Sequence, residues 1–266
     1  MGRKGLVSEP QAPARRVVLL GASNLAIHLP VVVETARRIW GSPLDVMAAL
    51  GHGRSYGMTS SVLGRVLPGI LRCGLWKDLQ ERPAAATAAL VTDIGNDVLY
   101  GAPVEQIARW VEESLARLAP IARPLVVTEL PLESTQALTA WRFLFLRSTF
   151  FPSCRLTFDE ALARTAELNE RVRELASRHE AVLVRPSAAW YGFDPIHIRA
   201  TRGAMVWREI LGFWSPEAEA AAARAPLVRS LALWRMRPLE RRLWGRAQHQ
   251  PQPAGRLDDG TTISLY

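Results

Sequence analysis

Two stretches far apart in the sequence hold the side chains that a serine-based catalytic site needs. Ser23 lies in the turn Gly-Ala-Ser-Asn that follows the apolar run 17–20. Asp194 and His197 lie three residues apart in Asp-Pro-Ile-His, so one helical turn would bring them to the same side of the chain. A serine hydroxyl is a weak nucleophile until a neighbouring base takes its proton, and a carboxylate can orient a histidine for that task. These residues predict Ser23 as nucleophile, His197 as base and Asp194 as the orienting acid.

The same chemistry needs fixed hydrogen-bond donors where negative charge develops on the attacked oxygen. The backbone amide of Ser23, an amide in the turn Gly51-His52-Gly53 and the side-chain amide of Asn96 could supply them. These three stretches and Asp-Pro-Ile-His follow four different apolar runs. Their combination therefore predicts an oxyanion hole around the hydroxyl of the nucleophile.

Each feature taken alone has an ordinary structural explanation. Ser23 could simply cap the next helix, and the glycines of 51–57 could serve a tight turn. Asp194 followed by proline is a common helix start, and a lone histidine such as His197 is more often structural. The catalytic interpretation depends on all four stretches lying together in one site.

The largely apolar runs before these stretches are predicted to be strands of one sheet buried on both faces, because their apolar residues do not alternate with polar ones. They lie at 17–20, 44–50, 87–93, 124–130 and 181–185. Apolar residues at helical spacing predict helices at about 29–40, 58–73, 103–118, 157–179 and 200–213. This alternation predicts a doubly wound α/β sandwich, in which ligands bind at the carboxyl ends of the strands.

Length and composition favour a soluble, cytoplasmic protein with a substantial core. The chain has 266 residues, of which 48% are hydrophobic. We see no apolar run of the ~18–20 residues that span a bilayer and no secretory leader. The two cysteines, Cys73 and Cys154, have neither metal-ligand spacing nor the pattern of a disulfide framework.

The net charge of +8 is confined to the two ends of the sequence. Residues 1–16 contribute +3 and residues 224–266 contribute +5, which leaves the body between them balanced. Because a nucleic-acid-binding domain usually has a basic stripe on its folded body, this distribution argues against a nucleic-acid partner. It predicts three parts: a basic flexible segment at 1–16, a catalytic domain at 17–222 and a basic Trp/Arg-rich extension at 223–266.

Two segments depart from the strand and helix alternation. Residues 136–157 are rich in aromatics and arginine, and we expect a helix packed on the core in preference to a lid. In the extension, Leu227, Leu231 and Trp234 would share a helix face among several arginines. Such a helix could lie on an anionic membrane surface. We favour packing against the body, since Pro238 interrupts the helix.

The order of the motifs resembles that of the SGNH/GDSL hydrolase superfamily, whose four blocks supply serine, glycine, asparagine and histidine. Ser23 in "GASNL" is similar to the first block, "LGHGRSYG" to the second, Asn96 in "IGND" to the third and "DPIH" to the last. The resemblance spans about residues 17–213. It implies a flavodoxin-like three-layer α/β/α sandwich with a central parallel sheet of about five strands. It also implies hydrolysis of an ester or O-acyl bond of a small-molecule substrate, without metal or cofactor.

The sequence departs from that family's pattern at Ala22, where the family has an aspartate. We therefore expect altered local hydrogen bonding there, and a non-catalytic ligand-binding protein is the alternative function. In the second block we prefer Gly53 to Gly51, because the polar pair Arg54-Ser55 follows it. The lack of a second glycine in "GASNL" argues against an ordinary α/β-hydrolase nucleophile elbow.

Three residues near these motifs are candidate substrate contacts: His52 and Arg54 in the glycine-rich turn, and Trp190 ahead of Asp194. Packing of Trp190 in the core and a solvated loop position for Arg54 are the alternatives. The sequence leaves the acyl substrate and the oligomeric state undecided.

Overall fold

The computed structural model describes residues 15–218 and 222–266. Most of the predicted N-terminal segment, residues 1–14, lies outside this range. Arg15 and Arg16, the last two residues of that segment, begin the first strand, and the side chain of Arg16 is paired with the buried Asp45 at 2.8 Å.

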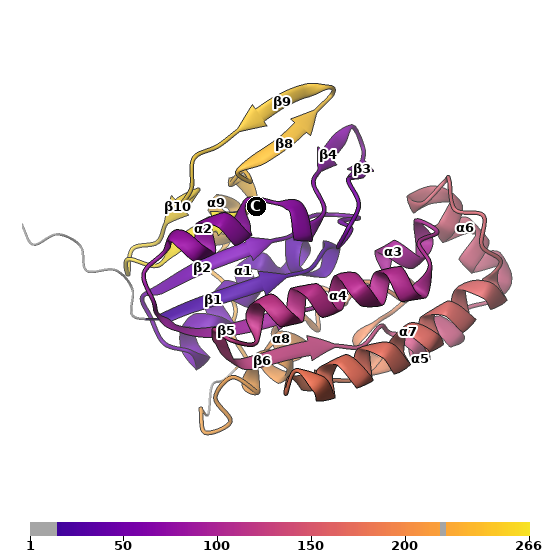
Figure 1. The fold of residues 1–266 in the computed structure, drawn as a ribbon, viewed down its shortest axis with the longest axis horizontal. Coiled ribbons are helices and arrows are strands. Elements are labelled where there is room, and N and C mark those ends of the chain that lie inside the picture. The colour runs from indigo at the N-terminus through magenta and orange to yellow at the C-terminus, as the bar shows by residue number, and fades with distance from the viewer. Residues whose placement is uncertain (1–14, 219–221) are drawn as a thin grey trace, which may run out of the picture.

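The centre of the fold is a seven-stranded sheet in the order β10-β11-β2-β1-β5-β6-β7 (Figure 1). The five strands from β2 to β7 in that order are parallel and match the predicted apolar runs. They are β1 (Arg15–Leu20), β2 (Leu44–Ala49), β5 (Ala86–Val91), β6 (Ala122–Thr128) and β7 (Val182–Val184). All their carboxyl ends therefore meet at one edge of the sheet.

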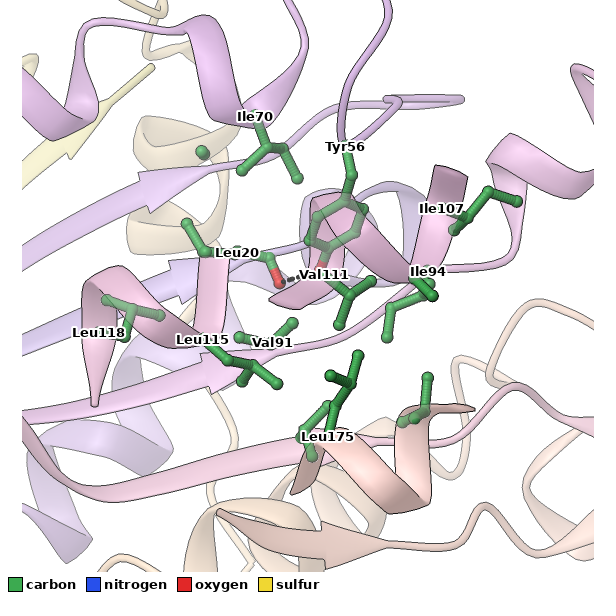
Figure 2. Packing of buried hydrophobic residues seen from close by; sticks show 14 of the residues in the cluster. Leu20, Tyr56, Ile70, Val91, Ile94, Ile107, Val111, Leu115, Leu118 and Leu175 are labelled. Atoms are coloured by element: carbon green, nitrogen blue, oxygen red, sulfur yellow. Dashed lines mark hydrogen bonds between the residues drawn. The ribbon is translucent and has the colours of Figure 1, made fainter. Parts of the chain in front are cut away.

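Helices cover both faces of the sheet, which explains why apolar residues of the strands point to both sides rather than alternating with polar ones. One face packs against α1 (Ser23–Ile39) and α8 (Gly203–Gly212), and the other against α2 (Leu75–Glu81), α4 (Val104–Leu118) and α7 (Phe158–Arg178). Figure 2 shows the second of these clusters, where Val111 and Leu115 of α4 pack beside Val91 of the sheet. The predicted three-layer α/β/α sandwich is confirmed.

The predicted helix at 58–73 is wrong. This segment forms the hairpin of β3 (Ser60–Val62) and β4 (Arg65–Leu67), followed by a 3-10 turn at Ile70–Arg72. The two residues at the hairpin tip, Leu63 and Gly64, both have positive φ (49° and 73°), as a tight two-residue turn requires. Pro68 and Gly69 then prevent a helix from continuing through the segment.

The C-terminal extension adds strands to two sheets. β11 (Thr262–Leu265) pairs parallel with β2, and β10 (Gly255–Arg256) pairs antiparallel with β11, so the central sheet has seven strands rather than about five. β8 (Glu240–Leu243) and β9 (Arg246–His249) join β4 and β3 in a separate antiparallel sheet, which projects from the body in Figure 1.

The helix of the extension, α9 (Leu227–Arg235), packs on the body through Leu233, which is buried in the same cluster as the apolar face of α1. The indole nitrogen of Trp234 also donates to the carbonyl of Ile27 in α1 at 3.3 Å. The face predicted from spacing is largely exposed: Leu227, Leu231 and Trp234 are 73%, 43% and 54% accessible. In residues 15–218 and 222–266, no helix is long and apolar enough to cross a membrane.

Residues 132–150 form two helices between β6 and α7: α5 (Leu132–Gln136) and α6 (Ala140–Phe150). α6 lies beside the ends of α3 (Asn96–Leu99) and α7 (Figure 1). It is this segment, together with the loops at the carboxyl edge of the sheet, that surrounds the candidate site.

Candidate active site

The structure brings Ser23, Asp194 and His197 into one hydrogen-bonded chain. Nε2 of His197 lies 2.9 Å from Oγ of Ser23, and Nδ1 of His197 lies 2.5 Å from Oδ2 of Asp194. The other carboxylate oxygen of Asp194 accepts the backbone amides of Ile196 (3.0 Å) and His197 (3.3 Å). These two bonds fold Asp194 and His197 into one turn, which sets the imidazole between the carboxylate and the hydroxyl.

The electrostatics of the pair suit proton transfer. Burial by itself lowers the pKa of His197, but the hydrogen bond and negative charge of Asp194 outweigh it, so that the pKa lies above its usual value of 6.5. For Asp194, burial raises the pKa, whereas His197 and the two backbone amides lower it, with a net decrease. Asp194 is therefore ionised at neutral pH and stabilises the imidazolium that forms when His197 takes a proton.

Ser23 is the first residue of α1, in a turn held by the carboxylate of Asp93 at the end of β5. Oδ2 of Asp93 accepts the backbone amides of Ala22 (2.9 Å), Asn24 (3.0 Å) and, more weakly, Leu25 (3.3 Å). These amides belong to the first turn of the helix, where backbone donors lack partners within the helix. Asp93 thus supplies the local hydrogen bonding at Ala22, from a different strand end.

Asn24 links the turn that holds Ser23 to the loop that holds His197. Its Nδ2 donates to Oδ1 of Asp93 at 2.8 Å and to the carbonyl of Ile196 at 2.9 Å, and its Oδ1 accepts the amide of Ile198 at 2.8 Å. The residues on both sides of His197 are therefore tied to the residue after Ser23. Sequence reasoning considered Asn24 only as a turn or helix-capping residue, and it placed Asp93 within the predicted strand 87–93 without a role of its own.

The candidate oxyanion donors lie on three different loops. Gly53 has φ of 63°, which favours glycine, and an added Cβ would lie 2.6 Å from Val62 and 2.9 Å from the hydroxyl of Tyr100. That hydroxyl donates to the carbonyl of Gly53 at 2.6 Å. Within the described part of the chain, no backbone carbonyl accepts the amide of either Ser23 or Gly53.

Asn96 begins the short helix α3, and one proton of its Nδ2 is donated to the carbonyl of Arg54 at 3.2 Å. This bond ties Asn96 to the glycine-rich loop. The next residue, Asp97, is fully buried and accepts the amide of Tyr56 at 2.8 Å. Burial raises the pKa of Asp97 to about 6, against the opposing hydrogen bonds from Ser55 and Tyr56.

The three candidate substrate contacts occupy different environments. His52 is exposed in the glycine-rich loop. Arg54 is fully buried, and its guanidinium donates to the carbonyls of Pro68 (3.2 Å), Leu50 (3.2 Å) and Tyr266. The prediction that Arg54 contacts substrate is therefore wrong, because its side chain instead holds the loop against the sheet. Trp190 is 2% exposed and lines a cavity beside Ser23.

That cavity has a volume of about 140 Å³ and lies at the carboxyl ends of β5, β6 and β7. Ser23, Asn96 and Asp194 line it on the side of the catalytic chain. The site therefore combines a hydrogen-bonded chain from Ser23 through His197 to Asp194, candidate oxyanion donors and an adjacent, partly open cavity.

No family model and no curated protein sequence matches the chain. Solved structures with the same fold do match. One is Est24, a carbohydrate acetylesterase from Sinorhizobium meliloti, with a TM-score of 0.51 and 14% identity over 73% of this chain and 96% of its own. Another is an inhibitor-bound aryl esterase from M. smegmatis, with a TM-score of 0.50 and 14% identity over 73% of this chain and 95% of its own. The chain therefore shares its fold with these two esterases.

Proposed function

We propose that the protein is a serine hydrolase of the SGNH type that cleaves an ester or O-acyl bond through an acyl-enzyme on Ser23. The continuous hydrogen-bonded chain from Ser23 Oγ through the imidazole of His197 to Asp194 supports this most directly. Helix capping by Ser23 does not explain this chain of hydrogen bonds, because Asp93 already accepts the amides at the start of α1.

In the first half of the reaction, Oγ of Ser23 attacks the carbonyl carbon while Nε2 of His197 takes the hydroxyl proton. The tetrahedral intermediate collapses, the bond to the leaving oxygen breaks, and His197 donates its proton to the departing alcohol. Asp194 keeps its negative charge throughout and favours the imidazolium form of His197. The increase in the pKa of His197 serves this step, since it strengthens the base.

In the second half, water enters and gives a proton to Nε2 of His197 as its oxygen attacks the acyl carbon. The acid is released and Ser23 recovers its proton. In both halves the negative oxygen would accept the amides of Ser23 and Gly53 and the second Nδ2 proton of Asn96. Fixed donors of this kind stabilise the charge without reorganising during the reaction.

The proposal is tested with p-nitrophenyl acetate and the variants Ser23→Ala and His197→Ala. We expect each to lower kcat at least 10³-fold, because the nucleophile or its base is missing. The matched controls are Ser177→Ala and His249→Ala, which change exposed residues away from the site. Circular dichroism and thermal unfolding establish that each variant is folded.

Wild-type turnover by folded Ser23→Ala would contradict the assignment of the nucleophile. Saturable binding of the ester by the wild type with no release of nitrophenol would favour the alternative, a ligand-binding protein with this fold. The two outcomes are distinct, since the first retains catalysis without Ser23 and the second lacks catalysis altogether.

A further inference from the structure

The cavity beside Ser23 extends away from the catalytic chain and beneath the helices that follow β6. On one side it is lined by Ser23 and Asn96, and on the other by residues of α6 and α7. It is therefore continuous with the position at which a carbonyl carbon must lie for attack by Oγ. A ligand group that occupies this space therefore lies next to the bond that is cleaved.

The distant part of the lining is apolar. It comprises, from α3, α6 and α7, the side chains of Val98, Leu99, Phe143, Leu146, Phe158 and Leu162. A space with such walls favours a ligand group without hydrogen-bonding atoms, because a buried polar group without a partner costs free energy.

Most of the charged groups in the lining are held by partners in the protein; the exception is Nε of Arg147, which is buried and has no hydrogen-bond partner in the described part of the chain. Asp93 and Asp194 belong to the catalytic end described above. Glu129 forms hydrogen bonds with the guanidinium of Arg173 at 2.8 and 3.1 Å. Arg147 donates to the carbonyl of Leu156 at 2.9 Å.

Helix α6 provides one wall of this space and is apolar on both sides. Phe143 and Leu146 line the cavity, whereas Trp141, Leu144 and Phe145 are 65%, 51% and 58% exposed. The segment predicted as a core helix or a lid is thus a helix with one face over the cavity. Two leucines of one helix, Leu146 inside and Leu144 outside, offer a matched pair for testing what the cavity binds.

We propose that this cavity binds the acyl chain of the substrate, and that the chain is an alkyl group of several carbons rather than acetyl. The proposal rests on the acyl-enzyme function of Ser23 stated above. The acyl carbon would lie at Ser23, with its alkyl chain running between α3, α6 and α7. The alcohol would leave on the side of His197, whose Nε2 must reach the departing oxygen.

The first test is a series of p-nitrophenyl esters from acetate to octanoate on the wild-type chain. Burying one methylene stabilises a complex by about 0.8 kcal/mol, which is about fourfold in an equilibrium constant. We expect kcat/KM to rise about fourfold per methylene until the cavity is filled. Sodium octanoate should also inhibit hydrolysis of the acetate ester competitively, at concentrations where sodium acetate does not.

The second test compares Leu146→Trp, which fills the cavity, with Leu144→Trp, which adds the same bulk to the outer face of α6. The measured quantity is the ratio of kcat/KM for octanoate to kcat/KM for acetate. We expect Leu146→Trp to lower this ratio at least tenfold and Leu144→Trp to leave it within twofold of the wild type. Leu162→Phe narrows the same space from α7 and replaces Leu146→Trp if that variant does not fold.

The outcomes separate this inference from the function on which it rests. The wild type could hydrolyse the acetate ester through Ser23 with a ratio of kcat/KM for the octanoate ester to kcat/KM for the acetate ester near one. That result overturns the acyl-chain proposal and leaves the hydrolase function standing. An equal loss of the ratio in Leu144→Trp and Leu146→Trp also overturns it. If no ester is hydrolysed and Ser23 resists a fluorophosphonate, both proposals fail.

Discussion

Replacing Asp93 with alanine should destabilise the protein and slow its chemistry through the same set of contacts. The carboxylate accepts one hydrogen bond from Nδ2 of Asn24 (2.8 Å) and three from backbone amides, of which those of Ala22 and Asn24 are the shorter two (2.9 and 3.0 Å). A hydrogen bond to a charged acceptor contributes roughly 1.5 kcal/mol at the lower end, so losing these two costs about 3 kcal/mol of unfolding free energy. The side chain of Asn24, which holds both neighbours of His197, loses one of its three hydrogen-bond partners as well.

The effect on catalysis follows from misplacement of Ser23 and His197 relative to each other. A displacement of about 1 Å at a reacting group can cost on the order of 10²-fold in rate, and we expect a loss of kcat of that size for Asp93→Ala. The pH limb of kcat should move to lower pH, because the negative charge of Asp93 helps to raise the pKa of His197; the larger influence, the contact with Asp194, is untouched. Asp93→Asn keeps one acceptor oxygen and should show a smaller loss of stability.

The assay is urea unfolding together with steady-state kinetics on an activated ester. Asp258→Ala, which removes an exposed aspartate, is the matched control and should stay within roughly 0.5 kcal/mol of the wild type. If Asp93→Ala unfolds like that control, Asp93 does not hold the turn of the nucleophile. A large loss of stability with unchanged kcat would show that Asp93 stabilises α1 without positioning Ser23.

Three further variants test the electrostatics of the site. Because the pKa of His197 is raised and the base must be neutral, the activity of the wild type should rise with pH through a value above 6.5. In a pH–rate profile, Asp194→Asn should move this rise to lower pH and reduce the maximal rate by about 10⁴-fold. Asn96→Ala should lower kcat by about 10²–10³-fold with little change in KM. An unchanged kcat would show that Asn96 does not contact the oxyanion. The pKa of Asp97 is raised on folding from 3.8 to about 6, so its contribution to stability is greatest below pH 3.8 and is lost as the pH rises through 6. Asp97→Asn should abolish this decline, which is roughly 2–3 kcal/mol in unfolding free energy between pH 4 and 8.

The parallel core of the sheet and the motifs at its carboxyl edge were accessible from sequence because both depend on local patterns. Buried parallel strands read as continuous apolar runs, and β1, β2, β5, β6 and β7 all do so. Since parallel strands align their carboxyl ends, finding Ser23 and His197 at two such ends was enough to predict that they lie together.

The features that sequence reasoning missed depend on contacts between distant residues. The hairpin of β3 and β4 pairs with β8, some 175 residues later, and an apolar pattern alone does not distinguish it from a helix. The strand β11 gains its place only by pairing with β2. Asp93 and Arg54 were missed or misassigned for the same reason: their partners, Ala22 and Tyr266, lie 71 and 212 residues away in the chain.

The measurement that tests the central claim most directly is labelling with a fluorophosphonate, followed by peptide mass mapping. The reagent phosphonylates serines that a base has activated, so the wild-type protein should carry a single adduct on Ser23. The adduct should be absent from His197→Ala, which keeps the serine but lacks the base. A folded wild-type protein with no adduct, or with an adduct that persists in His197→Ala, would contradict the activation of Ser23 by His197.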